Sequence, residues 1–173
     1  MNFSELNFSD DDFASPAWLN LSHRDFEFDG WQRLAESYGR SFETVTRLYG
    51  SKLLDAVAAA PTTRILDVAC GTGLLTSLAA SRGANVQGVD YSPAMIQVAT
   101  KRYPGIEFRE ADAGALPFDA ASFDAVLINF GINHFSEPLA AMQEVRRVLK
   151  PEGRIAFTVW DASGEMTLHS LAI

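Results

Sequence analysis

Cysteine, long apolar runs and a secretion signal are scarce or missing in this sequence. It contains one cysteine, Cys70, among 173 residues, which excludes an internal disulfide and indicates a reduced compartment. The acidic N-terminus lacks the apolar core of a signal peptide, and no apolar run is long enough to span a bilayer. We therefore expect a cytoplasmic protein without a membrane span.

Positive charge is also in short supply. The chain has 14 Lys and Arg residues against 22 Asp and Glu residues, a formal net charge of −8, and it has no run rich in Lys or Arg. Binding to phosphate backbones needs clustered basic side chains, so we do not expect a nucleic acid partner. The spacing of His and Cys offers no metal site. The length fits one domain, and 47% hydrophobic residues are enough to form a core.

Strand and helix patterns alternate from residue 63 onward. Helices are predicted to follow Gly73, Pro93 and Pro138, and proline suits the first turn of a helix. Strands are predicted at residues 64–68, 85–89, 106–110, 123–129 and 154–160. This alternation predicts an α/β fold: a doubly wound parallel sheet with helices on both faces and ligands at the carboxyl ends of the strands.

A turn with two glycines, Gly71 and Gly73, joins the first strand to the first of these helices. Such a turn binds nucleotides, because glycine lets the backbone bend tightly and lets a ligand approach closely. Asp90 ends the next strand at the spacing expected for a carboxylate that binds ribose hydroxyls. However, Thr76 stands where a dinucleotide turn has glycine or alanine, and Asp67 would repel a pyrophosphate. A nucleoside with a cationic end therefore fits better than NAD, and a dinucleotide oxidoreductase is the least favoured hypothesis.

Several segments together resemble the motifs of class I S-adenosylmethionine-dependent methyltransferases. They are Asp-Val-Ala-Cys-Gly-Thr-Gly at 67–73, Gly-Val-Asp-Tyr-Ser-Pro-Ala-Met at 88–95, Glu-Ala-Asp-Ala at 110–113 with Leu-Pro-Phe at 116–118, Ser-Phe-Asp-Ala-Val at 122–126, and Val-Leu-Lys-Pro-Glu-Gly at 148–153. The match is most similar to the small-molecule branch with the ubiquinone and menaquinone biosynthesis methyltransferases. It implies a Rossmann-like sheet of about five strands in the order 3-2-1-4-5, S-adenosyl-L-methionine as cofactor and a small-molecule methyl acceptor.

The resemblance also implies roles for single residues on the methionine side of the cofactor. Asp67 is expected to hold the amino group, directly or through water, since a buried carboxylate needs a partner. Asn129 and Phe130 end the fourth strand and are expected to line the methionine side with their backbone. The backbone expected to pass beneath the methionine and ribose belongs to Ala69, Gly71 and Gly73.

On the nucleoside side, Asp90 is expected to accept hydrogen bonds from both ribose hydroxyls. Its alternative role, capping the following helix, is better filled by Ser92 just before Pro93. The residues expected to contact the adenine are Tyr91, Met95, Asp112 and Ala113. Met95 has the alternative of packing in the core.

His134 lies just past the fourth strand, on the rim of the expected site. Methyl transfer needs the nucleophile aligned with the methyl group, water excluded and, for an acidic nucleophile, a base. His134 is the candidate base, with lining the pocket, or neither role, as the alternatives. Tyr38 lies in a stretch whose apolar spacing predicts an amphipathic helix at 31–49, which the resemblance places over the cofactor. Tyr38 either contacts the cofactor or is packed in the core.

The two ends of the chain leave questions open. Residues 1–50 are predicted to form an N-terminal flap and cap helix, with a further helix at 51–60, and residues 51–173 the cofactor-binding core. A tail packed on the domain or on a second subunit is the alternative for residues 1–30. After the fifth strand we expect a turn and a helix from near Ser163, in place of the two further strands usual in the resembling family. The fifth strand would then be an exposed sheet edge, on which a strand of another chain can pair. We therefore predict a homodimer or another segment that covers this edge. The absence of these strands also leaves an alternative to an enzyme, namely a non-catalytic protein that binds or senses the cofactor.

Overall fold

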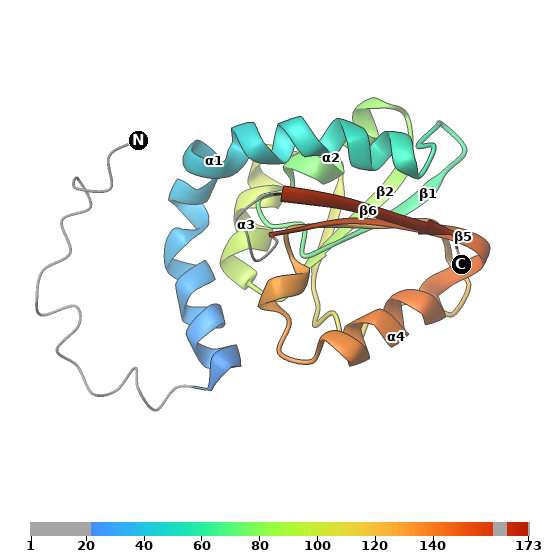
Figure 1. The fold of residues 1–173 in the computed structure, drawn as a ribbon. Helices are drawn as coiled ribbons and strands as arrows, with labels where there is room; N and C mark the ends of the chain where they lie inside the picture. The colour runs from blue at the N-terminus through green and yellow to red at the C-terminus, as the bar shows by residue number, and fades with distance from the viewer. Residues whose placement is uncertain (1–21, 161–165, 173) are drawn as a thin grey trace, which may run out of the picture.

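The computed structural model describes residues 22–160 and 166–172. In this part of the chain, parallel strands and helices alternate as predicted, with one long helix before them (Figure 1). The helices are α1 (His23–Ala56), α2 (Leu74–Ser81), α3 (Pro93–Arg102) and α4 (Pro138–Val148), with a short 3-10 turn at Ile132–His134. The strands are β1 (Arg64–Val68), β2 (Asn85–Asp90), β3 (Glu107–Glu110), β4 (Phe123–Asn129), β5 (Leu149–Trp160) and β6 (Met166–Ala172).

The strands form one sheet in the order β3-β2-β1-β4-β5-β6. The first five are parallel, in the predicted order 3-2-1-4-5, and β6 is antiparallel to β5. The strand order reverses at β1, so the carboxyl ends of β1, β2 and β4 meet at the point where ligands bind in sheets of this kind. The sheet thereby places the predicted binding turn at the centre of the fold.

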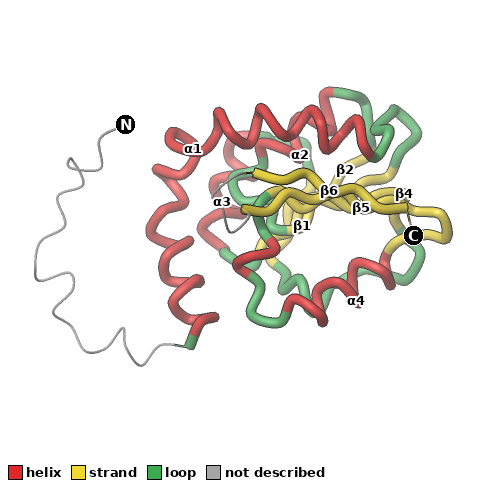
Figure 2. The backbone as a smooth tube through the Cα atoms, in the orientation of Figure 1, coloured by secondary structure: helices red, strands yellow, loops and turns green. Residues whose placement is uncertain are grey.

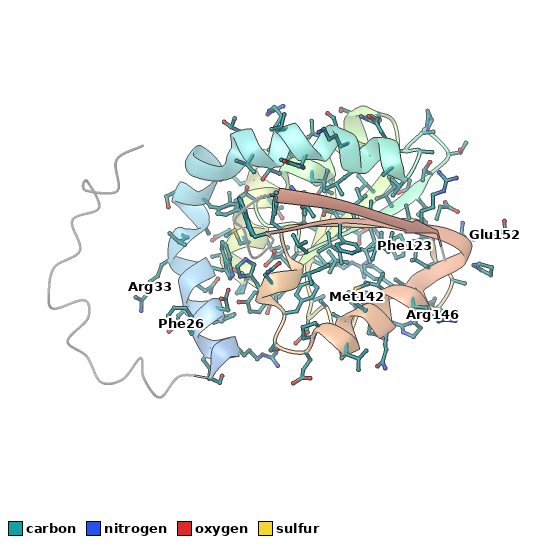
Figure 3. The ribbon with its side chains drawn as sticks, in the orientation of Figure 1. Phe26, Arg33, Phe123, Met142, Arg146 and Glu152 are labelled. Carbon is teal, nitrogen blue, oxygen red and sulfur yellow. The ribbon has the colours of Figure 1, made fainter. Side chains whose placement is uncertain are left out.

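Helices cover both faces of this sheet, as Figure 2 shows. On one face, Leu53 and Leu54 of α1 pack with Leu75 of α2 over Ile65 and Leu127 of the sheet. On the other face, α4 covers a second cluster that contains the fully buried Phe123. Figure 3 shows Phe123 and Met142 in the space between the sheet and α4. Each face therefore has its own apolar core, and the site lies at the strand ends between them.

The N-terminal helix is longer than predicted. Instead of separate helices at 31–49 and 51–60, α1 runs without interruption from His23 to Ala56, and its two halves run in different directions (Figure 1). Gly50 is not a break: an added Cβ there would lie 3.1 Å from Leu78 Cδ1, so glycine lets α1 approach α2 closely. Of the predicted flap at 1–30, residues 22–30 belong to the cap and first turns of α1, and residues 1–21 lie outside the described part.

The prediction for the C-terminal end is wrong in two respects. Residues 166–172 form a strand, not part of a helix from Ser163, and this strand pairs with β5 from Arg154↔Ala172 to Trp160↔Met166. The edge of β5 is therefore covered within the chain, which removes the reason for predicting a homodimer there. An antiparallel partner needs only a short connection, and it satisfies the backbone groups that an open edge would leave unpaired.

The ends of β1 and β4 approach each other unusually closely. Ala69 and Phe130, which directly follow these strands, adopt left-handed φ values of 57° and 59°. Gly131 lies beside them, and an added Cβ there would be only 2.6 Å from Ala69 Cβ. Left-handed backbone is uncommon for residues other than glycine and clusters at functional sites. The junction of these two neighbouring strand ends is therefore tightly packed and locally strained.

Candidate functional site

A cavity opens at the carboxyl ends of the parallel strands. Its walls come from α1, from the residues that end or follow β1, β2, β3 and β4, and from the start of α4, and they enclose about 860 Å³ with the open mouth included. We call this the main cavity. A smaller one, the side cavity, adjoins it between Thr46, Asp67 and Thr72, and the two share Tyr38 and Asn129 in their walls.

Asp67, on β1, faces the side cavity with one carboxylate oxygen unpaired. Its Oδ2 accepts a hydrogen bond of 2.6 Å from the Thr76 hydroxyl, whereas its Oδ1 is buried without a partner. Burial raises the pKa of Asp67 to about 7, against the Thr76 hydrogen bond that lowers it, and the negative Asp90 raises it further. Such a group favours either a proton or a cationic ligand.

Asp90, at the end of β2, is held in place by backbone donors. Its Oδ2 accepts from the Gly71 N–H at 2.8 Å and its Oδ1 from the Ser92 N–H at 2.9 Å. Burial raises the pKa of Asp90 to about 6, partly offset by these backbone hydrogen bonds. A carboxylate offers about four acceptor positions, so both oxygens keep capacity for a donor in the main cavity. Ser92 caps α3 as predicted, accepting from the Met95 N–H.

Asn129, at the end of β4, presents an unpaired donor. Its Oδ1 accepts from the Thr158 hydroxyl at 2.7 Å, and the same hydroxyl accepts from the Phe130 N–H at 3.0 Å. The Nδ2 group of Asn129 is buried without a partner. Phe130 is held between aromatic rings, edge-on to Tyr49 and stacked on Trp160. The end of β4 is therefore rigid, and Nδ2 has donor capacity for an acceptor in the cavities.

The residues that the sequence predicts to contact the adenine also line the main cavity. Asp112 accepts from the Gly114 N–H with Oδ1, and its Oδ2 pairs with Arg24 of α1 at 3.0 Å. Tyr91 contacts Phe28 of α1 edge to face, and burial raises its pKa. Met95 is 2% exposed and yet borders the main cavity, so its two predicted roles, core packing and ligand contact, are compatible.

Helix α1 brings side chains to this site that sequence reasoning missed. Glu27 Oε2 lies 2.7 Å from His134 Nδ1 and accepts from Trp31 Nε1 at 2.9 Å. Gln32 Oε1 accepts from the Ser92 hydroxyl and from the Ala94 N–H, at 2.7 and 2.9 Å. Together with Arg24, these contacts fasten the N-terminal half of α1 over the cavity. Sequence reasoning found only the apolar stripe that includes Trp31, because partners this distant leave no local signal.

The structure brings together all the predicted site residues except Gly73. That glycine borders neither cavity; its left-handed φ of 83° and an added Cβ only 2.7 Å from the Phe108 ring give it a conformational and packing role. The predicted residues that line the main or the side cavity are Tyr38, Asp67, Ala69, Gly71, Asp90, Tyr91, Met95, Asp112, Ala113, Asn129, Phe130 and His134.

Two further kinds of feature are absent from the described residues. In this part of the chain, no group of three or more His, Cys, Asp or Glu side chains is arranged to hold a metal ion. No described helix is both long enough and apolar enough to cross a membrane.

The sequence and the fold both match known proteins. A protein family described as "Methyltransferase domain" matches residues 66–157. A demethylmenaquinone methyltransferase of Renibacterium salmoninarum is 44% identical over 110 residues, which cover 64% of this chain and 46% of that protein. One of Clavibacter sepedonicus is 48% identical over 103 residues, 58% of this chain and 42% of that protein. The chain thus spans about half the length of the curated relatives it matches.

Among solved structures, a Pyrococcus horikoshii OT3 protein superposes with a TM-score of 0.63 at 33% identity. The match covers 70% of this chain and 56% of that one. The family match at residues 66–157 includes the ends of β1, β2, β3 and β4, which border the two cavities.

Proposed function

This chain belongs to the methyltransferase domain family, and from that premise we propose that it transfers a methyl group from S-adenosyl-L-methionine to a small molecule. The observation that carries this proposal is the set of polar groups at three strand ends. Asp67 Oδ1 is a buried acceptor and Asn129 Nδ2 a buried donor, both without a partner. The Asp90 carboxylate, held by two backbone donors, stands at the third strand end.

These groups fit the parts of S-adenosyl-L-methionine. An unpaired carboxylate oxygen suits an ammonium group, an unpaired amide N–H suits a carboxylate, and the two together suit the zwitterionic end of an amino acid. Asp90 has acceptor capacity for the ribose hydroxyls. Asp112, the Ala113 backbone and the ring of Tyr91 would hold the adenine. Since a buried polar group without a partner is costly, ligand binding would relieve a cost that the protein carries by itself.

The cofactor supplies a methyl group on a positively charged sulfur. The residues of this chain then have to bind, align and exclude water. Asp67 and Asn129 fix one end of the ligand and Asp90 its middle, which leaves the remaining part of the main cavity for the acceptor. Trp31 and Phe135 line this part with aromatic surface and His134 adds a ring with basic nitrogen. We therefore propose a flat, largely apolar acceptor, with His134 as the base where the nucleophile is acidic.

The relatives suggest the first acceptor to test. Because the curated relatives are named demethylmenaquinone methyltransferases, we propose demethylmenaquinone as a candidate acceptor. A cytoplasmic location stays a prediction from the single free thiol, Cys70.

Calorimetric titration with S-adenosyl-L-methionine and S-adenosylhomocysteine, with NAD as a control ligand, tests cofactor binding. We expect micromolar binding of the first two and none of NAD. Asp67→Asn should weaken binding of both, because it removes the negative charge opposite the ammonium group. Asp119→Asn is the matched control: it makes the same chemical change on an exposed residue outside both cavities.

Turnover with demethylmenaquinone then separates the enzyme from a protein that only binds the cofactor. Formation of a methylated product together with S-adenosylhomocysteine supports the proposal. Failure of both cofactor forms to bind would contradict it. Tight cofactor binding without turnover of demethylmenaquinone or of related phenols and enols would favour the non-catalytic alternative.

A further inference from the structure

A carboxylate of α1 contacts the one histidine of the main cavity. Glu27 Oε2 and His134 Nδ1 are 2.7 Å apart although 107 residues separate them in sequence. Both side chains are largely withdrawn from solvent, with 17% of Glu27 and 32% of His134 exposed. This burial matters because exposed ion pairs contribute little, whereas a shielded charge-assisted hydrogen bond fixes the geometry of both groups.

The carboxylate of Glu27 determines which nitrogen of His134 carries hydrogen, because it acts as an acceptor in the contacts described here. Trp31 Nε1 can only donate, and it donates to the same Oε2 at 2.9 Å. An ionised carboxylate only accepts, so His134 Nδ1 must be the donor in its own contact. The neutral ring is then the Nδ1–H tautomer, and its lone pair is on Nε2. In a structure without observed hydrogens, this assignment follows from the partners of the ring.

The plane of the His134 ring is fixed as well. Trp31 meets it edge to face, with 4.8 Å between ring centroids and an angle of 86°, and Trp31 is itself held edge-on by Tyr38. The ring borders the main cavity. Both the tautomer and the orientation of His134 therefore depend on the N-terminal half of α1, a segment outside the methyltransferase motifs.

We propose that Glu27 is a positioning residue that holds His134 as the Nδ1–H tautomer, so that Nε2 removes a proton from the methyl acceptor. This inference rests on the proposed function. It restricts the acceptor to molecules that become nucleophilic by losing a proton, such as phenols, enols and acidic carbon acids. A carboxylate that orients a histidine in this way also stabilises the imidazolium formed after proton transfer.

The proton and electron pairs balance in this step. The acceptor proton goes to His134 Nε2, and the electron pair left on the acceptor forms the new bond to the methyl carbon. The electron pair of the broken carbon–sulfur bond stays on sulfur, which becomes neutral. No oxidant, reductant or metal is required.

Other ionisable groups face the same cavity. They are Arg24, Tyr38, Asp90, Tyr91, Asp112 and Glu137. Asp90 is near enough that a positive charge on His134 lowers the Asp90 pKa. Asp90 is held by backbone N–H groups, whereas Glu27 contacts His134 Nδ1 directly, so Glu27 is the carboxylate that sets the tautomer.

Nitrogen-15 NMR of histidine-labelled protein tests the tautomer without any acceptor. The chain has three histidines, and His134→Asn identifies the signal of interest. We expect neutral His134 to show protonated Nδ1 and unprotonated Nε2, opposite to the tautomer preferred by free histidine. Glu27→Ala should abolish this preference. Glu27→Gln, which keeps one acceptor oxygen, should retain most of it. Asp29→Ala, an exposed carboxylate two residues away on α1, should leave it unchanged.

Kinetics with demethylmenaquinone supply the second measurement. Glu27→Ala should lower kcat on the order of tenfold to a hundredfold, part of the usual effect of a general base, while KM for S-adenosyl-L-methionine stays within twofold of the wild type, roughly. Glu27→Gln should recover part of the loss. An Nε2–H tautomer in the wild type, or an unchanged kcat in Glu27→Ala, would overturn the proposal. Absence of turnover in the wild type would count against the proposed function, and the NMR result would still decide the role of Glu27.

Discussion

The buried Asp67 predicts an unusual pH dependence of stability for the protein without ligand. Its pKa in the folded state is raised to about 7, above the value near 4 of an unfolded chain. A carboxyl with a raised folded pKa stabilises the fold fully below its unfolded pKa, and this contribution is lost as the pH rises through the folded pKa. The free energy of unfolding should therefore decrease between about pH 5 and pH 7, whereas paired carboxylates would make it increase.

The magnitude follows from the size of the shift. One pKa unit corresponds to about 1.36 kcal/mol. Because Asp67 becomes half ionised at its folded pKa, the range from pH 5 to pH 7 removes roughly 2 kcal/mol through this group. That is a large part of the stability of a typical domain, about 5–15 kcal/mol. Asp90, with its pKa raised to about 6, acts in the same direction over the lower half of this range.

Urea unfolding at pH 5, 6, 7 and 8, followed by tryptophan fluorescence, measures this effect. The comparison is between the wild type, Asp67→Asn and the exposed control Asp119→Asn. Asp67→Asn removes the titrating group but keeps an oxygen that can accept from Thr76, so its stability should vary less with pH by the amount given above. The control should follow the wild type. The same slope in the wild type and in Asp67→Asn would refute the reasoning that burial keeps this carboxyl partly protonated.

Three further predictions concern other parts of the site. Asp90→Ala should weaken binding of S-adenosyl-L-methionine by about 1–3 kcal/mol, because hydrogen bonds to a charged group are lost; calorimetry at pH 7.5 measures this, and unchanged affinity would remove the ribose assignment. Gly131→Ala should destabilise the fold by about 1–3 kcal/mol through the close contact with Ala69. Gly30→Ala, with no atom within 4 Å of the added Cβ, should instead stabilise α1 slightly. Equal urea midpoints for the two variants would contradict this. Gln32→Ala should lower the free energy of unfolding by about 1 kcal/mol per hydrogen bond lost at the start of α3, and Gln32→Glu, which keeps the acceptor, should retain most of it.

The central fold could be predicted because its signals are local. Strands β1 and β4 have the predicted bounds, and α2 begins directly after Gly73 as expected. In these segments, apolar runs, the glycine turn and the proline starts all indicate the same structure. The order of the strands and the site at their carboxyl ends then follow from the family resemblance and from the rules for doubly wound sheets.

The remainder depends on contacts between distant residues. Glu27 lies in a segment without clear periodicity, and its partner His134 is 107 residues away. The strand at 166–172 forms because β5 offers a free edge, which is a property of the assembled sheet and not of those residues alone. Gly50 stands between the helices predicted at 31–49 and 51–60, but α1 continues through it, and the close approach of Leu78 explains the glycine. In each case tertiary packing decides what local preference leaves open.

The single helix α1 combines two different local stabilities. Its C-terminal half buries Leu53 and Leu54 completely, while its N-terminal half leaves Phe26 57% and Leu34 48% exposed. This half is held by polar contacts and by edge-to-face contacts of its aromatic rings. Figure 3 shows Phe26 and Arg33 on its outer side. Segments with few buried apolar contacts open at low free energy while the rest stays folded. Amide hydrogens in the first turns should therefore exchange far faster than those near Leu53. The N-terminal half of α1, which covers the main cavity, can consequently open and reform many times within the lifetime of the folded sheet. We therefore expect local opening of this helix end to control the entry of ligands.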